Sequence, residues 1–150
     1  MWKKYRRAIY WTVGLFVVVV AGSIGRQVGS ELFRPSKTES LNNLVTQAAT
    51  QLNAQAPKKI DEITTLVRAE ASMGSKLTTF YVLENYDSYG KDFSLDAVRL
   101  AATKHACSKK DSTGNSALAM GITYAYVYTR RDGSVIGRFE VAQQDCYRTS

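Results

Sequence analysis

The chain has 150 residues, of which 45% are hydrophobic and 22% charged, and its formal net charge is +7 at pH 7. This length suits one domain with one modest core. Residues 1–34 carry six basic side chains and one acidic side chain, whereas residues 35–150 carry fourteen and twelve. Phosphate recognition relies on a concentrated basic face, so this nearly balanced outer part argues against a nucleic-acid partner.

The N-terminus has the pattern of a membrane anchor. Residues 1–7 contain four basic side chains and precede the uncharged residues 8–25. As a helix, these 18 residues would measure about 27 Å, close to the thickness of the hydrocarbon core of a bilayer. Basic flanks stay in the cytoplasm, so we expect residues 8–25 to contact membrane lipid and the rest of the chain to lie outside.

Cleavage of this segment is the alternative. Ala21 and Ser23 form a small-x-small pair that a signal peptidase accepts, which would release the domain into the periplasm. The uncharged run continues past that point and is longer than a usual signal core. Retention in the bacterial inner membrane as a single-pass anchor is therefore preferred.

Residues 26–37 are interpreted as a linker and residues 38–150 as an extracytoplasmic domain. The domain begins with apolar positions spaced by three and four residues, which predicts an amphipathic helix over 38–55. Ser40 is its expected N-cap, and Pro57 ends it.

Residues 60–71 fit either a helix or a strand by spacing and composition. The following segment decides for a strand, because residues 72–75 form a turn and residues 76–84 alternate as a β-strand does. A β-hairpin over 63–71 and 76–85 is therefore predicted.

A second helix is expected from Asp92 or Ser94 to about Cys107. A short helical turn over 117–120 follows, closed by Gly121. The last hairpin is the clearest element, with strands over 122–129 and 135–143. This order predicts an α+β domain with a four-stranded antiparallel sheet made of two hairpins and with two helices on one face.

Cys107 and Cys146 are the only cysteines. In an oxidising compartment an even count predicts one disulfide, which would join a helix end to the end of the last strand. Free thiols or a catalytic Cys107 are the alternatives. They are less favoured because His105 would point to a different face of a helix.

Two segments of the domain carry a resemblance. One runs from Leu52 to Pro57 and on through Asp61 to Leu66. The other joins a cysteine to residues 121–128, to Asp132 and Gly133, and to a closing Asp145 and Cys146. Together they resemble small exported bacterial proteins of unknown function. The resemblance implies the hairpins and the cysteine pair, and it implies no catalytic or binding residues.

Tyr124, Tyr126 and Tyr128 alternate, so they share one face of a strand. This stripe is a possible binding surface, because tyrosine contributes contact area at a low ordering cost. Packing beneath a helix is the preferred interpretation, since the opposite row of the strand is smaller and more easily solvated.

No motif specifies a reaction, a cofactor or a metal. His105 is the only histidine, and no metal-ligand spacing accompanies it. Asp61 with Glu62, and Asp87 with Asp92, are best interpreted as turn and helix-start residues. The leading hypothesis is therefore a membrane-anchored, non-enzymatic interaction module with an envelope protein as its partner. The alternative is a periplasmic inhibitor or immunity protein that binds a toxin or hydrolase.

Overall fold

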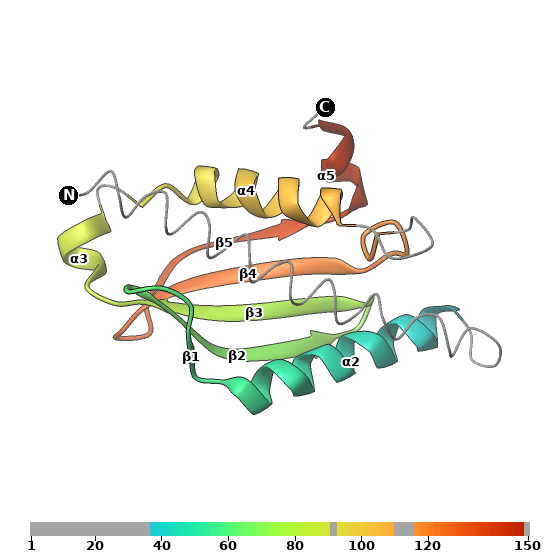
Figure 1. Ribbon diagram of the computed structural model, residues 1–150, viewed down its shortest axis with the longest axis horizontal. Coiled ribbons are helices and arrows are strands. Elements are labelled where there is room, and N and C mark those ends of the chain that lie inside the picture. Colours follow the sequence, from blue (N-terminus) through green and yellow to red (C-terminus); the bar gives the residue numbers. More distant parts are fainter. Residues whose placement is uncertain (1–36, 91–92, 110–115, 149–150) are drawn as a thin grey trace.

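The computed structural model describes residues 37–90, 93–109 and 116–148 (Figure 1). The predicted N-terminus 1–7, membrane segment 8–25 and all but the last residue of the predicted linker 26–37 lie outside these ranges, as does Ser23. None of the helices in the described ranges combines the length and the apolar composition that crossing a bilayer requires.

The elements confirm the α+β class. The sheet has five strands in the order β1-β2-β3-β4-β5. In chain order the elements are α2 (Lys37–Gln55), β1 (Lys58–Lys59), β2 (Thr64–Ser72), β3 (Lys76–Leu83), α3 (Tyr86–Tyr89), α4 (Leu95–Ser108), β4 (Thr123–Arg130), β5 (Val135–Val141) and α5 (Gln143–Arg148). Both predicted hairpins are present, as β2 with β3 and β4 with β5.

The prediction of a purely antiparallel sheet of four strands is wrong. β3 and β4 pair in parallel at the centre of the sheet, from Lys76 opposite Thr123 to Leu83 opposite Arg130. The reason is the direction of α4, which carries the chain back along the sheet so that β4 starts beside the start of β3. The fifth strand, β1, adds two residues to the outer edge of β2.

Both long helices pack on one face of the sheet. Figure 1 shows α2 beside β2 and α4 beside β5, at opposite margins. The buried face of α2 is apolar at every third or fourth position, and it joins the helix-facing rows of β2 to β5 in one core. That core includes Val45, Leu66, Tyr81, Val98 and Val141. The opposite face of the sheet carries no helix among the described residues, and this surface is called the open face below.

A β-bulge in β2 decides which side chains reach the open face. Leu66 pairs with Tyr81, but Arg68 pairs with Phe80, so Val67 is an extra residue in the strand. In a regular strand Arg68 would share the buried face with Leu66, because alternate residues point to the same side. The bulge therefore brings Arg68 to the open face.

The helix starts were predicted with unequal success. Ser94 is the N-cap of α4, and its side-chain oxygen accepts a hydrogen bond from the backbone N–H of Ala97 at 3.2 Å. The N-cap prediction for Ser40 is wrong, because α2 begins at Lys37 and places Ser40 inside the helix. Residues 117–121 form a turn, in which Gly121 has a φ of +107°.

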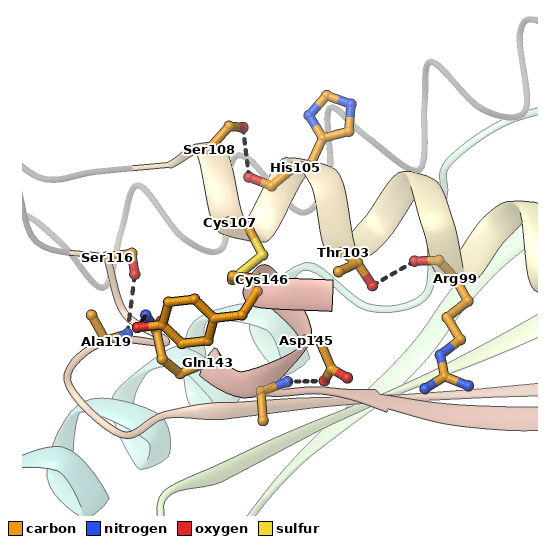
Figure 2. The surroundings of a disulfide bond; sticks show 12 residues. Arg99, Thr103, His105, Cys107, Ser108, Ser116, Ala119, Gln143, Asp145 and Cys146 are labelled. Carbon is orange, nitrogen blue, oxygen red and sulfur yellow. Dashed lines mark hydrogen bonds between the residues drawn. A yellow bond between two sulfur atoms is a disulfide. The ribbon is translucent and has the colours of Figure 1, made fainter. Parts of the chain in front are cut away.

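The structure joins Cys107 to Cys146 in a disulfide, as the cysteine count predicts (Figure 2). Their Cα atoms are 5.5 Å apart, and 39 positions separate them in the sequence. The bridge connects the last turn of α4 with α5, a short helix that the sequence analysis did not predict. Asp145 in α5 accepts a hydrogen bond from the backbone N–H of Ala142 at 2.8 Å, which caps the start of α5 (Figure 2).

Candidate interaction surfaces

The open face has an apolar centre. Phe80 and Val82 of β3 lie beside Val127 and Thr129 of β4, and all four side chains are half-buried. Ala125, on the same row of β4, is 7% exposed. These residues form a mainly apolar strip across β3 and β4, called the apolar strip below.

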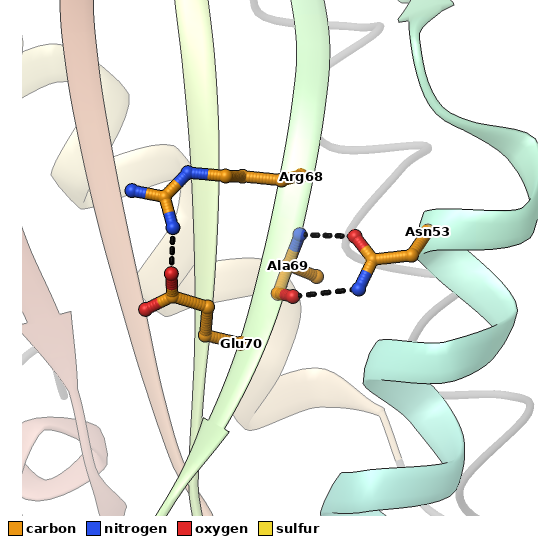
Figure 3. A network of polar contacts seen from close by, with 4 residues as sticks. All are labelled: Asn53, Arg68, Ala69 and Glu70. Atoms are coloured by element: carbon orange, nitrogen blue, oxygen red, sulfur yellow. Dashed lines mark hydrogen bonds and ion pairs between the residues drawn. The ribbon is translucent and has the colours of Figure 1, made fainter.

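Arg68 covers part of this strip. Its guanidinium lies 3.7 Å from the centroid of the Phe80 ring, within the range of a cation–π contact. Arg68 also forms an ion pair with Glu70 of the same strand (Figure 3). Two contacts therefore hold one long side chain against the aromatic ring.

A second ion pair crosses the open face. The Nζ atom of Lys76 in β3 lies 2.5 Å from Oε1 of Glu140 in β5, so the pair spans β4 near Thr123 and Ala125. Both partners are partly solvent-exposed, and such a pair contributes about 0.2–1 kcal/mol at most. Its effect is to place opposite charges at the border of the apolar strip.

The tyrosines of the predicted stripe lie on the helix-covered face. Tyr124, Tyr126 and Tyr128 are 4%, 4% and 1% exposed. Tyr126 and Tyr128 stack against Phe139, with ring centroids 4.8 and 6.3 Å apart, and Tyr128 also stacks on Tyr81 at 5.1 Å. In this structure they are packing residues and not a solvent-facing recognition surface.

Burial changes the chemistry of these phenols. It raises the pKa of Tyr81, Tyr124, Tyr126 and Tyr128 above the ordinary tyrosine value, because the charged form loses its hydration. The hydroxyl oxygens of Tyr124, Tyr128 and Thr64 are buried without a hydrogen-bond partner among the described residues. An unpaired buried hydroxyl destabilises the folded state. A phenol with a raised pKa stays protonated at neutral pH, so these tyrosines are not suited to acid–base chemistry.

The carboxylates of Asp61 and Asp87 lie in a turn and in the first turn of α3, respectively. Asp61 accepts hydrogen bonds from the backbone N–H groups of Ile63 and Thr64 at 2.9 and 2.7 Å. Asp87 lies 3.8 Å from the Arg130 guanidinium on the surface. Asp92 is outside the described residues, so its proximity to Asp87 is not tested.

His105 lies in the last turn of α4. Its backbone carbonyl accepts hydrogen bonds from the Ser108 hydroxyl at 3.0 Å and from the Lys109 N–H at 3.2 Å. Figure 2 shows its ring pointing away from the disulfide. Within the ranges that the structure describes, no group of His, Cys, Asp and Glu side chains is placed to hold a metal ion.

The sequence analysis did not find Arg68 and Phe80 as surface residues. Both belong to segments in which the strand alternation was recognised, but the bulge at Val67 reverses the side to which Arg68 points. The sequence does not reveal this bulge, because valine, which stands at position 67, is common in regular strands.

Comparison with known proteins shows a fold shared with solved structures. No family model and no curated protein matches the sequence. Three solved structures resemble the chain. The pilotin EpsS of the Vibrio vulnificus type 2 secretion system has a TM-score of 0.60 and 19% identity, over 73% of this chain and 94% of that one. The pilotin AspS of the Vibrio cholerae type II secretion system has a TM-score of 0.57 and 24% identity, over 73% and 95%.

The third structure is a candidate secreted protein from Pseudomonas aeruginosa, with a TM-score of 0.60 and 16% identity over 75% of this chain and 98% of that one. The likeness spans almost the whole of each of these proteins. At these identities it establishes a common fold and leaves function open. The domain of this chain thus has the fold of these two pilotins and of the candidate secreted protein.

Proposed function

We propose that this chain is an extracytoplasmic protein-interaction module without enzymatic activity, held at the bacterial inner membrane by residues 8–25. Its partner is another protein of the cell envelope. The observation that supports this function is the shared fold, because two of the matching structures are components of a secretion system and the third is named as secreted. The basic N-terminus and the disulfide agree with that location.

The open face is the surface that suits a partner best. It combines an apolar centre at Phe80, Val82 and Val127 with charged residues at its border, which is the usual composition of a protein interface. Arginine and aromatic residues supply a large share of binding energy at interfaces. Because Arg68 already lies on Phe80, less side-chain freedom is lost when a partner covers them.

The described polar residues support a non-enzymatic role. Asp61 and Asp145 accept backbone hydrogen bonds in turns and caps, and both cysteines are joined to each other. These groups stabilise the fold and do not converge on one point where a substrate would bind.

Site-specific photo-cross-linking in intact cells tests this function. The photoreactive amino acid p-benzoylphenylalanine replaces Phe80 on the open face and, in a matched control, Leu100, which is exposed on the outer side of α4. We expect the Phe80 position to give an adduct with one envelope protein and the Leu100 position to give none.

A second variant separates binding from folding. Val127→Asp introduces a charge into the apolar strip and should abolish the adduct from position 80. The charge lowers the thermal midpoint at this half-buried position, so circular dichroism at the growth temperature must show that the variant is still folded. No adduct from position 80, or equal adducts from both positions, would contradict the proposed function.

A further inference from the structure

The two outer edges of the sheet differ in how their backbone hydrogen-bonding groups are covered. The edge of β2 is protected by β1, which pairs with Thr65 and Leu66. Further along, the Asn53 side chain donates a hydrogen bond to the Ala69 carbonyl and accepts one from the Ala69 N–H, both at 2.8 Å (Figure 3). An amide side chain thus occupies the backbone groups that another strand would use. Natural proteins protect sheet edges in such ways because an open edge pairs with other chains.

The edge of β5 has no comparable protection. Among the described residues, only those of β4 exchange backbone hydrogen bonds with Val135–Val141. α4 approaches β5 from the helix-covered face, where Leu95 lies over Gly137. The outward backbone groups of residues 137–141 are therefore available to a further strand.

The charges on β5 indicate which strand could pair with its free edge. Arg138 and Glu140 are exposed on the open face and are two positions apart. Glu140 Oε1 pairs with Lys76 across β4, so a second copy would meet the other oxygen of this carboxylate. Charged side chains on an edge usually prevent pairing, because like charges meet. Here the two signs alternate, so an antiparallel copy of the same strand can place opposite charges against each other.

Only one register of the two β5 strands sets Arg138 of one copy against Glu140 of the other. A two-fold axis perpendicular to the sheet pairs each residue with another on the same face, so the axis runs between the two β5 strands, level with one residue of each. An axis at Arg138 sets arginine against arginine, and an axis at Glu140 sets glutamate against glutamate. An axis at Phe139 sets Arg138 of each copy against Glu140 of the other, and Gly137 against Val141.

We propose that two copies of this chain associate through antiparallel pairing of their β5 strands about Phe139, held in register by two Arg138–Glu140 pairs. The sheet then continues across the dimer, and the two open faces lie on the same side of it. A partner that binds one open face meets a surface twice as wide.

Charge reversal in the full chain, purified in detergent micelles, tests the dimer. Arg138→Glu sets two glutamates against the two native ones and should raise the dissociation constant of the dimer about tenfold or more, as measured by sedimentation equilibrium. Arg138→Glu combined with Glu140→Arg restores the complementarity between the copies and should recover the dimer, although it also replaces the Lys76–Glu140 pair within each copy by two like charges. Arg131→Glu is the matched control, since it makes the same charge change at the exposed hairpin turn and should leave the dimer intact.

Cysteine cross-linking tests the register. We expect disulfide-linked dimers when the Arg138→Cys and Glu140→Cys proteins are mixed, and about tenfold less when either is oxidised alone, because only the mixture brings two introduced thiols opposite each other. A monomeric wild-type chain overturns the proposal. So does a dimer that Arg138→Glu leaves unchanged, or a cross-link as strong in Arg138→Cys alone as in the mixture.

Discussion

The side chain of Leu95, at the start of α4, lies directly over Gly137 of β5. A Cβ atom at position 137 would be 2.4 Å from Leu95 Cδ2 and 3.4 Å from its Cγ. A glycine within a strand ordinarily weakens it, so this one is explained by the close approach of the helix. The contact sets how near α4 can come to the sheet.

Gly137→Ala should therefore destabilise the domain. The added methyl group forces the half-buried Leu95 side chain into another rotamer, which costs about 1 kcal/mol, partly offset because alanine suits a strand better than glycine. Urea unfolding of the variant measures the change. In a Leu95→Ala background the same substitution should cost much less, whereas an equal cost in both backgrounds would show that the contact is not responsible.

Asn53→Ala should lower stability by about 1–3 kcal/mol, because the Ala69 N–H and carbonyl lose both of their partners. Amide hydrogen exchange should show faster exchange at Ala69 than in the wild type. Gln51→Ala is the control, since Gln51 is exposed on the same helix. An Asn53→Ala protein as stable as this control would mean that water replaces the side chain without loss.

Cys146→Ser should lower the free energy of unfolding by about 4 kcal/mol on the chain-entropy account, because the bridge closes a loop of roughly 40 residues. Thermal unfolding of the oxidised proteins measures it. The double variant Cys107→Ser/Cys146→Ser should match the single variant. If it is clearly more stable, the free Cys107 thiol and not the lost loop closure accounts for the effect.

Tyr124→Phe and Tyr128→Phe should leave stability unchanged or raise it by up to about 1 kcal/mol. Each removes a buried hydroxyl that has no hydrogen-bond partner in the part of the chain that the structure describes, while the ring contacts remain. Chemical unfolding at neutral pH gives the comparison. A loss of more than about 1 kcal/mol would indicate an ordered water or another group bound to the hydroxyl.

Stability should fall at alkaline pH. The pKa of each buried tyrosine is raised in the folded state, whereas in the unfolded chain it stays near its ordinary value of about 10. The folded protein therefore binds more protons above about pH 10, and the stabilisation present below that pH is lost as the unfolded phenols ionise. Urea unfolding at several pH values between 8 and 11 should show this decline. Tyr124→Phe should reduce its slope, and an unchanged slope would contradict the assignment.

Local pattern was sufficient for most elements of the fold. Residue alternation and the turn sequences predict both hairpins to within a few residues, and the spacing of apolar residues predicts α2 and α4. Strand β1 and helices α3 and α5 were missed, because each spans six residues or fewer and carries no periodic signal.

The parallel pairing of β3 with β4 was missed for a different reason. It depends on where α4 returns the chain, which is a tertiary property and not a property of either hairpin. The candidate surface was only partly predictable. The small row of β4 was expected to be solvated, but the position of Arg68 over Phe80 depends on the bulge.

The central parallel pair has a consequence for assembly of the domain. Each hairpin is local in sequence and can form early, but the strands of the two hairpins pair where residues 76–83 meet residues 123–130, about 47 positions later. Cleaving the peptide backbone between α4 and β4 would leave two fragments that the disulfide still tethers, since Cys107 and Cys146 lie on opposite sides of that break. The sulfur bridge thus supplies a second covalent route across the junction, which would keep a domain nicked by a protease in one piece.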